Sequence, residues 1–479
     1  MLRPSRALVR SAGALLLCAS PGLAAVPASA APVAARDDAA RADFDGDGYA
    51  DQVISAPEAT VDGREDAGYL VVVYGSGDGV DTGRRQLLSR AAPGVPGRPA
   101  AHQQWGRRAV ARDLDGDGVT DLAVSGRGRW SVTVLWGARD GGLTEAVTLP
   151  EVDSGAARLV AGDFDGDGHA DLAGGGGEQH GYGDLRVLHG PFDRATGLAA
   201  RTTELETGKQ DPPTELVAGD LTGDGVDDLV SMHAFEERSE RSLFWRGGRD
   251  GPARVPAPLE DASAGAVGDV DGDGYGDLVL RPVPGGVVEN LPYDPGTVRV
   301  LYGSPGGPGA GGRTATLTQE SPGVPGTDEE GDQFGAALAA GDVTGDGFAD
   351  VAVGVPYEDL AGADTRDTGA VVLLQGSADG LRGRGARAFH QATPGVTGIA
   401  EAADGFGSAV SLRDLDADGH ADLALGTPGE DSVSRTDTGA AWVFRGTAGG
   451  VTTGGLVSFG PGQLGAPETG ARLGSAFAR

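Results

Sequence analysis

The chain has 479 residues, 85 glycines, one cysteine and a formal net charge of −32 at pH 7. This length fits one large domain or two to three ordinary ones, and a single cysteine, Cys18, excludes an intrachain disulfide. The acidity argues against nucleic acid as a partner, because a phosphate backbone is bound by clustered Lys and Arg.

Residues 1–30 have the pattern of a secretory signal peptide. Arg3, Arg6 and Arg10 form a basic start, 11–20 an apolar core, and 28–30 (Ala-Ser-Ala) a cleavage site. The apolar run is too short to span a membrane, and no later stretch is long and apolar enough to do so. We therefore expect a secreted, extracellular protein without a membrane span, in which 31–42 form a short lead.

One nine-residue motif recurs seven times from residue 43 onward. Positions 1, 3, 5 and 9 carry Asp, except for Thr222 and Thr344 at position 3, and position 6 is always Gly. Alternating oxygen side chains on a tight turn suit a hard cation, since Ca²⁺ takes about 6–8 oxygen ligands and glycine permits the turn. The copies occupy 43–51, 113–121, 163–171, 220–228, 269–277, 342–350 and 414–422.

We expect these loops to bind up to seven Ca²⁺ through the side chains at positions 1, 3, 5 and 9 and the backbone carbonyl at position 7. Thr222 and Thr344 offer a neutral hydroxyl, which predicts weaker binding in their loops. The predicted ligands are Asp43, Asp45, Asp47, Tyr49 and Asp51; Asp113, Asp115, Asp117, Val119 and Asp121; Asp163, Asp165, Asp167, His169 and Asp171; Asp220, Thr222, Asp224, Val226 and Asp228; Asp269, Asp271, Asp273, Tyr275 and Asp277; Asp342, Thr344, Asp346, Phe348 and Asp350; and Asp414, Asp416, Asp418, His420 and Asp422.

Other interpretations of the motif explain it less well. An EF-hand needs Glu at position 12, which no copy has. A polar turn without metal would not keep four oxygen positions in register seven times, and Mg²⁺ resists dehydration. Ala417 replaces glycine at position 4 of the last copy, which we expect to be tolerated if this residue has a negative φ. We expect the side chains of His169 and His420, at position 7, to face solvent.

Short strand-like runs surround each copy. Around 342–350, for example, they are 334–342, 350–356, 369–377 and 387–391, which are apolar or alternating and end near Gly or Pro. The first copy lacks a preceding strand, and the final residues, 472–479, resemble the missing one. A repeat split between the two ends of the chain indicates a closed ring without free edges. We therefore predict an all-β, seven-bladed β-propeller over 43–479 that is closed by the C-terminal strand.

The segment 334–356 combines Phe-Gly, the loop motif and a final Val-Gly-Val-Pro, and the same combination recurs in 406–428. In 105–125 it begins with Trp-Gly. This pattern resembles the FG-GAP repeat, as in the N-terminal propeller of integrin α subunits, and the shorter units resemble repeats of secreted bacterial proteins. The resemblance implies calcium loops on one face and a ligand on the opposite face. Integrin-style heterodimer signalling is not implied, because the stalk domains, the transmembrane helix and the inserted adhesion domain are missing.

These features favour a monomeric extracellular binding or adhesion module with structural calcium, whose partner is a protein or a polysaccharide. The sequence has no recognisable catalytic motif, so we do not expect an enzyme. The alternatives are a polysaccharide-acting hydrolase or lyase that uses the propeller channel, and a structural surface-layer component. The residues that we expect at the binding face are Tyr357, Glu358, Asp359, Arg366, Glu430, Asp431 and Arg435.

Overall fold

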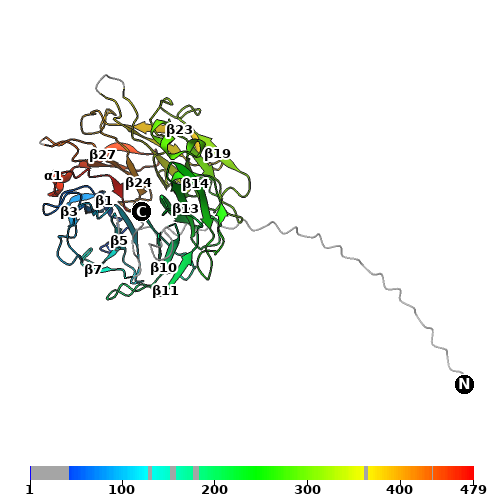
Figure 1. Cartoon of the computed structure of the whole chain (residues 1–479). Coiled ribbons are helices and arrows are strands. Elements are labelled where there is room, and N and C mark those ends of the chain that lie inside the picture. The colour runs from blue at the N-terminus through cyan, green and yellow to red at the C-terminus, as the bar shows by residue number, and fades with distance from the viewer. Residues whose placement is uncertain (2–41, 128–131, 151–157, 176–182, 361–364, 434) are drawn as a thin grey trace.

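The computed structural model describes residue 1 and residues 42–127, 132–150, 158–175, 183–360, 365–433 and 435–479. The predicted signal peptide (1–30) and lead (31–42) lie outside the described residues, except for their end residues Met1 and Ala42. The described residues form seven four-stranded antiparallel sheets, which surround a common centre in Figure 1. The predicted seven-bladed β-propeller is confirmed.

Each sheet is one blade, and we number the blades in chain order. Blade 1 contains β28 (Ala476–Phe477), β1 (Gln52–Ala56), β2 (Tyr69–Tyr74) and β3 (Asp81–Leu88). Blade 2 contains β4 (Arg108–Arg112), β5 (Asp121–Ser125), β6 (Thr133–Trp136) and β7 (Glu145–Thr148). Blade 3 contains β8 (Leu159–Gly162), β9 (Asp171–Gly175), β10 (Leu185–His189) and β11 (Arg201–Leu205).

The remaining blades follow the same plan. Blade 4 contains β12 (Glu215–Gly219), β13 (Asp228–Phe235), β14 (Arg238–Trp245) and β15 (Ala257–Pro258). Blade 5 contains β16 (Ala262–Gly268), β17 (Asp277–Pro282), β18 (Val298–Leu301) and β19 (Thr314–Leu317). Blade 6 contains β20 (Ala337–Gly341), β21 (Asp350–Val355), β22 (Ala370–Gln375) and β23 (Arg382–Phe389), and blade 7 contains β24 (Ala409–Arg413), β25 (Asp422–Thr427), β26 (Ala440–Arg445) and β27 (Thr452–Phe459).

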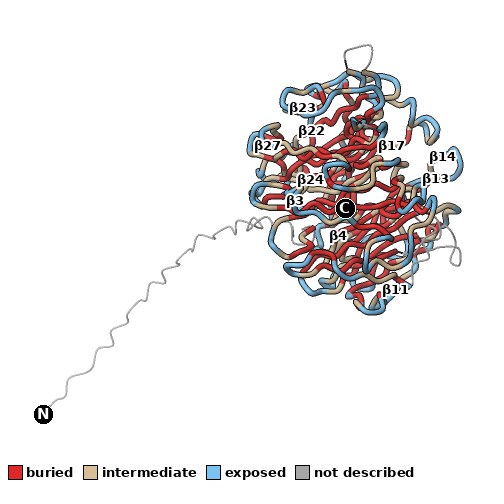
Figure 2. The backbone as a smooth tube through the Cα atoms, turned by 90° about the vertical axis from the view of Figure 1, so that its left-hand side faces the viewer, coloured by how far each residue is buried: buried red, intermediate tan, exposed pale blue. Residues whose placement is uncertain are grey.

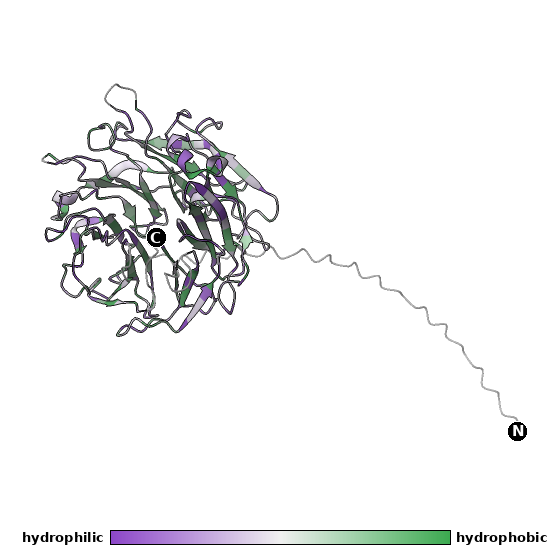
Figure 3. Cartoon of the chain, viewed as in Figure 1, coloured by the Kyte–Doolittle hydropathy of each residue, from purple (hydrophilic) through white to green (hydrophobic). Residues whose placement is uncertain are grey.

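The hydrophobic core lies between neighbouring blades. The second strands β21 and β25 are buried along their whole length, because both of their faces are covered by other blades. Leu373 of blade 6, for example, packs in one cluster with Leu423 and Phe444 of blade 7. Figure 2 shows the same distribution, with buried backbone inside and exposed backbone in the peripheral loops. Figure 3 shows hydrophobic residues concentrated on the inner strands.

The ring is closed by the C-terminus, as the split repeat predicts. In β28, Phe477 pairs with Ile54 and Ala476 with Ser55 of β1. The N–H of Gly474 donates to the Ser55 carbonyl (3.0 Å). The strand is shorter than the predicted 472–479, but it supplies the inner strand of blade 1 and covers the edge of β1. The C-terminus lies at the centre of the ring in Figure 1.

Helical structure is limited to short turns in the described part of the chain. The 3₁₀ helices η2 (Pro284–Gly286) and η3 (Val288–Tyr293) occupy an insertion of blade 5, and the α-helix α1 (Pro461–Leu464) follows β27. None of the helices in the described ranges is long and apolar enough to cross a membrane.

The antiparallel topology separates two sets of loops. In blade 6, residues 342–349 join β20 to β21, whereas 356–369 join β21 to β22 at the opposite end of the strands. The connector between blades 6 and 7, residues 390–408, leaves β23 at that same opposite end. We call the two ends the metal-loop face and the connector face.

Candidate metal centres

The seven motif copies, numbered metal loops 1–7 in chain order, join the first and second strands of their blades. Each is wound around its position-1 carboxylate. In loop 6, Asp342 Oδ1 accepts the N–H groups of Gly345 (2.7 Å) and Asp346 (3.1 Å), and Oδ2 accepts that of Gly347 (2.7 Å). Gly347 has a φ of 88°, which favours glycine at position 6. The carboxylate therefore sets the turn that sequence alone could attribute only to the glycines.

The position-9 aspartate is buried and ties each loop to the third strand of its blade. Asp350 Oδ2 accepts the Val343 N–H (3.1 Å) and Oδ1 accepts the Gly376 N–H (3.0 Å), and all seven copies repeat this pair. This structural role was not apparent from the sequence.

Burial raises the pKa of these position-9 carboxyls. The pKa is about 6 at Asp350, about 7 at Asp228, Asp277 and Asp422, and about 8 at Asp51 and Asp121, with burial as the largest cause in each. At neutral pH the loops therefore contain closely spaced carboxyls whose ionised form costs free energy unless a cation is nearby.

The donor atoms of the loops fit a hard cation. In loop 1 the carboxylate oxygens of Asp43, Asp45 and Asp51 lie within 4.8 Å of one another, and loops 2, 3 and 5 contain similar groups. The two hydroxyls at position 3 are a second indication that the loops suit a cation. Thr222 Oγ1 and Thr344 Oγ1 are buried without a hydrogen-bond partner, which suits an oxygen that ligates a metal. Of the predicted side-chain ligands, those at positions 1, 3 and 9 are thus brought together in loops 1 and 2, and those at positions 1, 3 and 5 in loops 3 and 5.

The position-7 residues have a further role, because their side chains pack on the preceding loop. A Cβ added to Gly345 of loop 6 would lie 2.7 Å from the His420 ring, and one added to Gly272 would lie 2.6 Å from the Phe348 ring. His420 Nδ1 also lies 3.1 Å from the Val343 carbonyl oxygen. His169 is half-buried as well. The expectation that both histidines face solvent was wrong, since the next loop lies too close.

Backbone hydrogen bonds also join neighbouring loops. The N–H at position 8 donates to the position-1 carbonyl of the preceding loop, as from Ala421 to Asp342 (2.8 Å) and from Ala349 to Asp269 (2.8 Å). The same bond joins loops 1 and 2, loops 3 and 4, and loops 4 and 5. These neighbouring loops are therefore linked directly through their backbones.

Ala417 has a φ of +58°, so the condition under which we expected alanine to be tolerated, a negative φ, is not met. Position 4 is left-handed in the other loops too, as at Gly46 (70°) and Gly345 (68°). The turn around the position-1 carboxylate imposes this conformation whatever residue is present. An alanine there carries a strain of roughly 1–2 kcal/mol, which glycine avoids.

Arginines contact the position-3 carboxylates from outside the loops. Each Asp at position 3 has such a partner, and the pairs are Arg84–Asp45, Arg194–Asp115, Arg201–Asp165, Arg313–Asp271 and Arg445–Asp416. Sequence analysis missed these arginines because they come from different places: Arg445 ends a third strand, Arg84 and Arg201 lie on fourth strands, and Arg194 belongs to the next blade. They offset part of the negative charge of each loop.

The two loops with threonine at position 3, loops 4 and 6, differ from the other five in their surroundings. In loop 4, Arg246 pairs instead with Asp224 at position 5 (2.9 Å). In loop 6, a cavity of about 600 Å³ is lined by Thr344, Asp346, Asp350 and Arg382, among others. Loop 6 therefore combines a neutral position 3 with an adjacent cavity.

The predicted binding residues lie on the connector face, in the loops between second and third strands. Tyr357, Asp359, Arg366, Asp431 and Arg435 are exposed, whereas Glu358 and Glu430 are half-buried. Each of these two glutamates accepts a hydrogen bond from a glutamine of the preceding blade: Gln319 Nε2 donates to Glu358 (2.6 Å) and Gln391 Nε2 to Glu430 (2.5 Å). The two junctions thus repeat one arrangement, which we call the connector-face acidic clusters.

Each cluster includes an aspartate from the connector. The N–H of Glu329 donates to Asp332 Oδ2 (2.9 Å) and that of Glu401 donates to Asp404 Oδ2 (2.7 Å). Burial, and secondarily the neighbouring carboxylates, raise the pKa of Asp332 and Glu430 to about 7 and that of Asp404 to about 6. Within the described residues none of these carboxylates forms an ion pair with Arg or Lys. The sequence analysis found the glutamates but not their glutamine and aspartate partners.

Comparison with family models supports this architecture. Residues 113–174 match the FG-GAP-like repeat, and residues 334–374 and 406–444 match the FG-GAP repeat. The chain is a propeller that contains FG-GAP repeats. The matches begin at Asp113 of loop 2 and at the Phe-Gly pairs of blades 6 and 7, which agrees with the resemblance drawn from the sequence. The FG-GAP segments contain metal loops 6 and 7 complete.

Curated relatives are mainly integrin α chains. Integrin alpha pat-2 of Caenorhabditis briggsae is 30% identical over 226 residues, 43% of this chain and 17% of that protein. Integrin alpha-4 of Xenopus laevis is 30% identical over 123 residues, 26% of this chain and 10% of that protein. Phosphatidylinositol-glycan-specific phospholipase D of Bos taurus is 33% identical over 118 residues, 25% of this chain and 14% of that protein. The chain thus spans less than a fifth of each of these relatives.

Among solved structures, a mutant of AofleA from Arthrobotrys oligospora aligns with a TM-score of 0.37 at 10% identity, over 76% of this chain and 92% of that one. This alignment carries no argument about the site.

Proposed function

We propose that this FG-GAP propeller is a calcium-binding protein of the secreted bacterial type. It acts as a monomeric extracellular binding or adhesion module. Its metals are structural, and its ligand binds on the connector face. The observation that supports this most is the separation of the two sets of carboxylates: one set lies in the metal loops, and the other, without Arg or Lys partners among the described residues, lies on the opposite face.

In the metal loops, the aspartates at positions 1, 3, 5 and 9 and the carbonyl at position 7 would hold each Ca²⁺. When bound, the ion supplies positive charge to carboxyls that burial makes costly to ionise. The chain's own contribution is to orient the ligands: backbone N–H groups fix the position-1 and position-9 carboxylates, and arginines fix position 3. The ligands are thereby preorganised.

On the connector face, the acidic clusters at the junctions of blades 5–6 and 6–7 suit a partner with basic groups. Glu358 and Glu430 are half-buried and held by glutamines, while Asp359 and Asp431 extend into solvent beside them. Exposed Tyr357 adds an aromatic surface next to the first cluster. An extracellular protein with clustered Lys or Arg, or a polysaccharide with amino groups, would complement this charge.

A binding screen against extracellular proteins and polysaccharides, in calcium and in EDTA, tests the proposal. The double variant Glu358→Gln/Glu430→Gln should lose binding of the captured ligand. The matched control Asp379→Asn, an exposed acid in the turn between β22 and β23 on the metal-loop face, should keep it. If Asp379→Asn lost binding and the double variant kept it, the ligand would bind on the metal-loop face, which would contradict the proposal. Turnover of a polysaccharide in the same screen would replace the binding module by the hydrolase or lyase alternative.

A further inference from the structure

Metal loop 3 differs from the others in the residue that ends the third strand of its blade. His189 is the last residue of β10 and precedes Gly190, whose N–H donates to Asp171 of the loop. The equivalent residues, each directly before the glycine that donates to position 9, are Tyr74, Trp136, Arg246, Tyr302, Gln375 and Arg445. Loop 3 is thus the one metal loop with an imidazole at this place.

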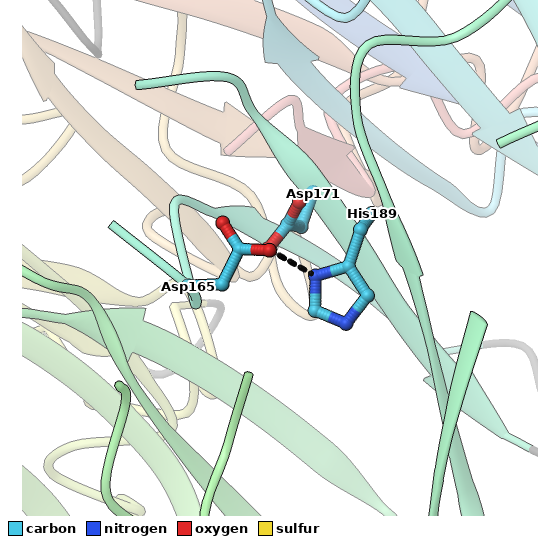
Figure 4. A group of neighbouring side chains, drawn as sticks. All are labelled: Asp165, Asp171 and His189. Atoms are coloured by element: carbon cyan, nitrogen blue, oxygen red, sulfur yellow. Dashed lines mark hydrogen bonds and ion pairs between the residues drawn. The ribbon is translucent and has the colours of Figure 1, made fainter. Parts of the chain in front are cut away.

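The imidazole faces two predicted metal ligands. His189 Nδ1 lies 3.0 Å from Asp171 Oδ2 and 3.2 Å from Asp165 Oδ2. Figure 4 shows the ring edge turned toward both carboxylates. The exposed fraction is 1% for His189, 0% for Asp171 and 8% for Asp165. One nitrogen and two oxygens therefore converge in a site closed to solvent.

A second contact orients the ring. His189 Nε2 lies 3.0 Å from Thr203 Oγ1 on β11, and Arg201 donates to that hydroxyl (3.0 Å) as well as to Asp165 Oδ2 (2.6 Å). When Nε2–H donates to Thr203, Nδ1 directs its lone pair at two carboxylate oxygens. That arrangement is favourable when a cation lies between them, and a metal-ligating histidine usually donates its other N–H in this way.

We propose that loop 3 binds a divalent transition metal of the Zn²⁺ class through His189 Nδ1, Asp165 and Asp171, while the other loops bind calcium. An imidazole nitrogen suits Zn²⁺ and other late first-row metals, whereas Ca²⁺ prefers oxygen ligands. The inference rests on the proposed role of the loops as cation sites, but it is independent of the ligand on the connector face.

Metal titration of the full chain tests the inference. The EDTA-stripped protein is saturated with Ca²⁺ and titrated with Zn²⁺, and bound Ca²⁺ and Zn²⁺ are counted by elemental analysis. Co²⁺ is then used in place of Zn²⁺ to give a visible absorption spectrum that reports a nitrogen ligand. We expect one equivalent of Zn²⁺ to remain bound in excess Ca²⁺.

The variant His189→Gln carries the residue that this chain has at position 375, so the blade should fold. It should lower Zn²⁺ affinity at least about tenfold and change the Co²⁺ spectrum, with Ca²⁺ binding elsewhere retained. His102→Gln, at an exposed histidine of the connector between blades 1 and 2, is the control and should leave both unchanged. Equal Zn²⁺ binding in wild type and His189→Gln, or none in wild type, would overturn the inference. Absence of bound Ca²⁺ from every loop would instead refute the calcium part of the proposed function.

Discussion

Phe477 lies directly opposite Ile54 in the antiparallel pair of β28 and β1. The two residues belong to one hydrophobic cluster, which also contains Leu415, Val443 and Leu473. The last residues of the chain therefore contribute both strand hydrogen bonds and core packing to the first blade. Closure of the ring depends on this contact, because β28 supplies the inner strand of blade 1.

Truncation of the closing strand should destabilise the whole propeller. Phe477→Ala should lower the free energy of unfolding by about 3–5 kcal/mol, because it removes a buried aromatic side chain. Deletion of 474–479 should cost more, since it also removes the strand pairing. Thermal unfolding followed by circular dichroism measures both. A truncated protein that melts at the wild-type temperature would contradict the closed ring.

Calcium removal should lower the melting temperature strongly. A ligand that binds only the folded state at a hundred times its Kd adds about 2.7 kcal/mol per site, and the metal loops provide up to seven sites. Differential scanning calorimetry in millimolar Ca²⁺, millimolar Mg²⁺ and EDTA checks this. We expect Ca²⁺ to restore the transition fully and Mg²⁺ poorly. The same melting temperature in EDTA and Ca²⁺ would show that the loops do not need metal.

Asp350→Asn should destabilise blade 6 even in EDTA. The wild-type carboxylate accepts one N–H at each oxygen, and an amide has only one acceptor oxygen, so one buried N–H loses its partner. The expected cost is about 1–3 kcal/mol. Asp346→Asn at exposed position 5 of the same loop is the control and should affect calcium affinity rather than stability in EDTA. Chemical unfolding of both variants in EDTA separates these roles.

Ala417→Gly should stabilise the protein. The left-handed backbone at this exposed residue strains alanine, and glycine should recover about 1 kcal/mol. Gly345→Ala, at the equivalent position of loop 6, is the reverse test. It should destabilise by more, because its Cβ would also meet the His420 ring. Urea unfolding of the two variants measures both effects, and a less stable Ala417→Gly would refute the strain.

Glu430→Gln should stabilise the protein at high pH but not at low pH. The folded-state pKa of Glu430 is raised from 4.5 to about 7, mainly by burial and then by Asp404, so the folded state binds the proton more tightly than the unfolded state. Wild-type stability therefore falls as pH rises between about 4.5 and 7, and the variant lacks this loss. Because the side chain is half-exposed, we expect a gain of about 1–2 kcal/mol above pH 7.

Unfolding measured at pH 4.5 and pH 8 checks the pH dependence of Glu430→Gln. A gain of the same size at both pH values would mean that the charge of Glu430 is not its cause. Glu401→Gln, an exposed acid of the same cluster, is a suitable control and should change stability little at either pH.

The sequence predicted the fold well because its signals are local and repeated. Seven copies of one motif, the strand-like runs around them and the split repeat at 472–479 determine blade number, strand order and closure. The positions of the predicted metal ligands follow from spacing within nine residues. The resemblance of 334–356 and 406–428 to FG-GAP repeats agrees with the family-model matches.

The missed features arise between segments that are distant in the chain. Arg194 reaches Asp115 of the preceding blade, and Gln391 reaches Glu430 of the next. The separation between arginine and aspartate differs from loop to loop, so no sequence pattern shows these pairs. The separation between glutamine and glutamate is 39 residues at both junctions, so that pair could have been noticed. The positive φ of Ala417 did not follow from the sequence either, since the position-1 carboxylate dictates the turn geometry. His189 could have been noticed, because it alone is histidine among the residues before the third-strand glycines.

In five of the seven metal loops, the position-7 side chain packs on the position-4 glycine of the preceding loop, and this packing gives the ring a direction. Tyr275 lies on Gly223, Phe348 on Gly272 and His420 on Gly345. The packing surface of a blade is therefore specific for the blade that precedes it. Blades of this protein should not be interchangeable as modules, even though they share a motif. A circular permutant that keeps every neighbouring pair should tolerate rearrangement better than a chain in which two blades are exchanged.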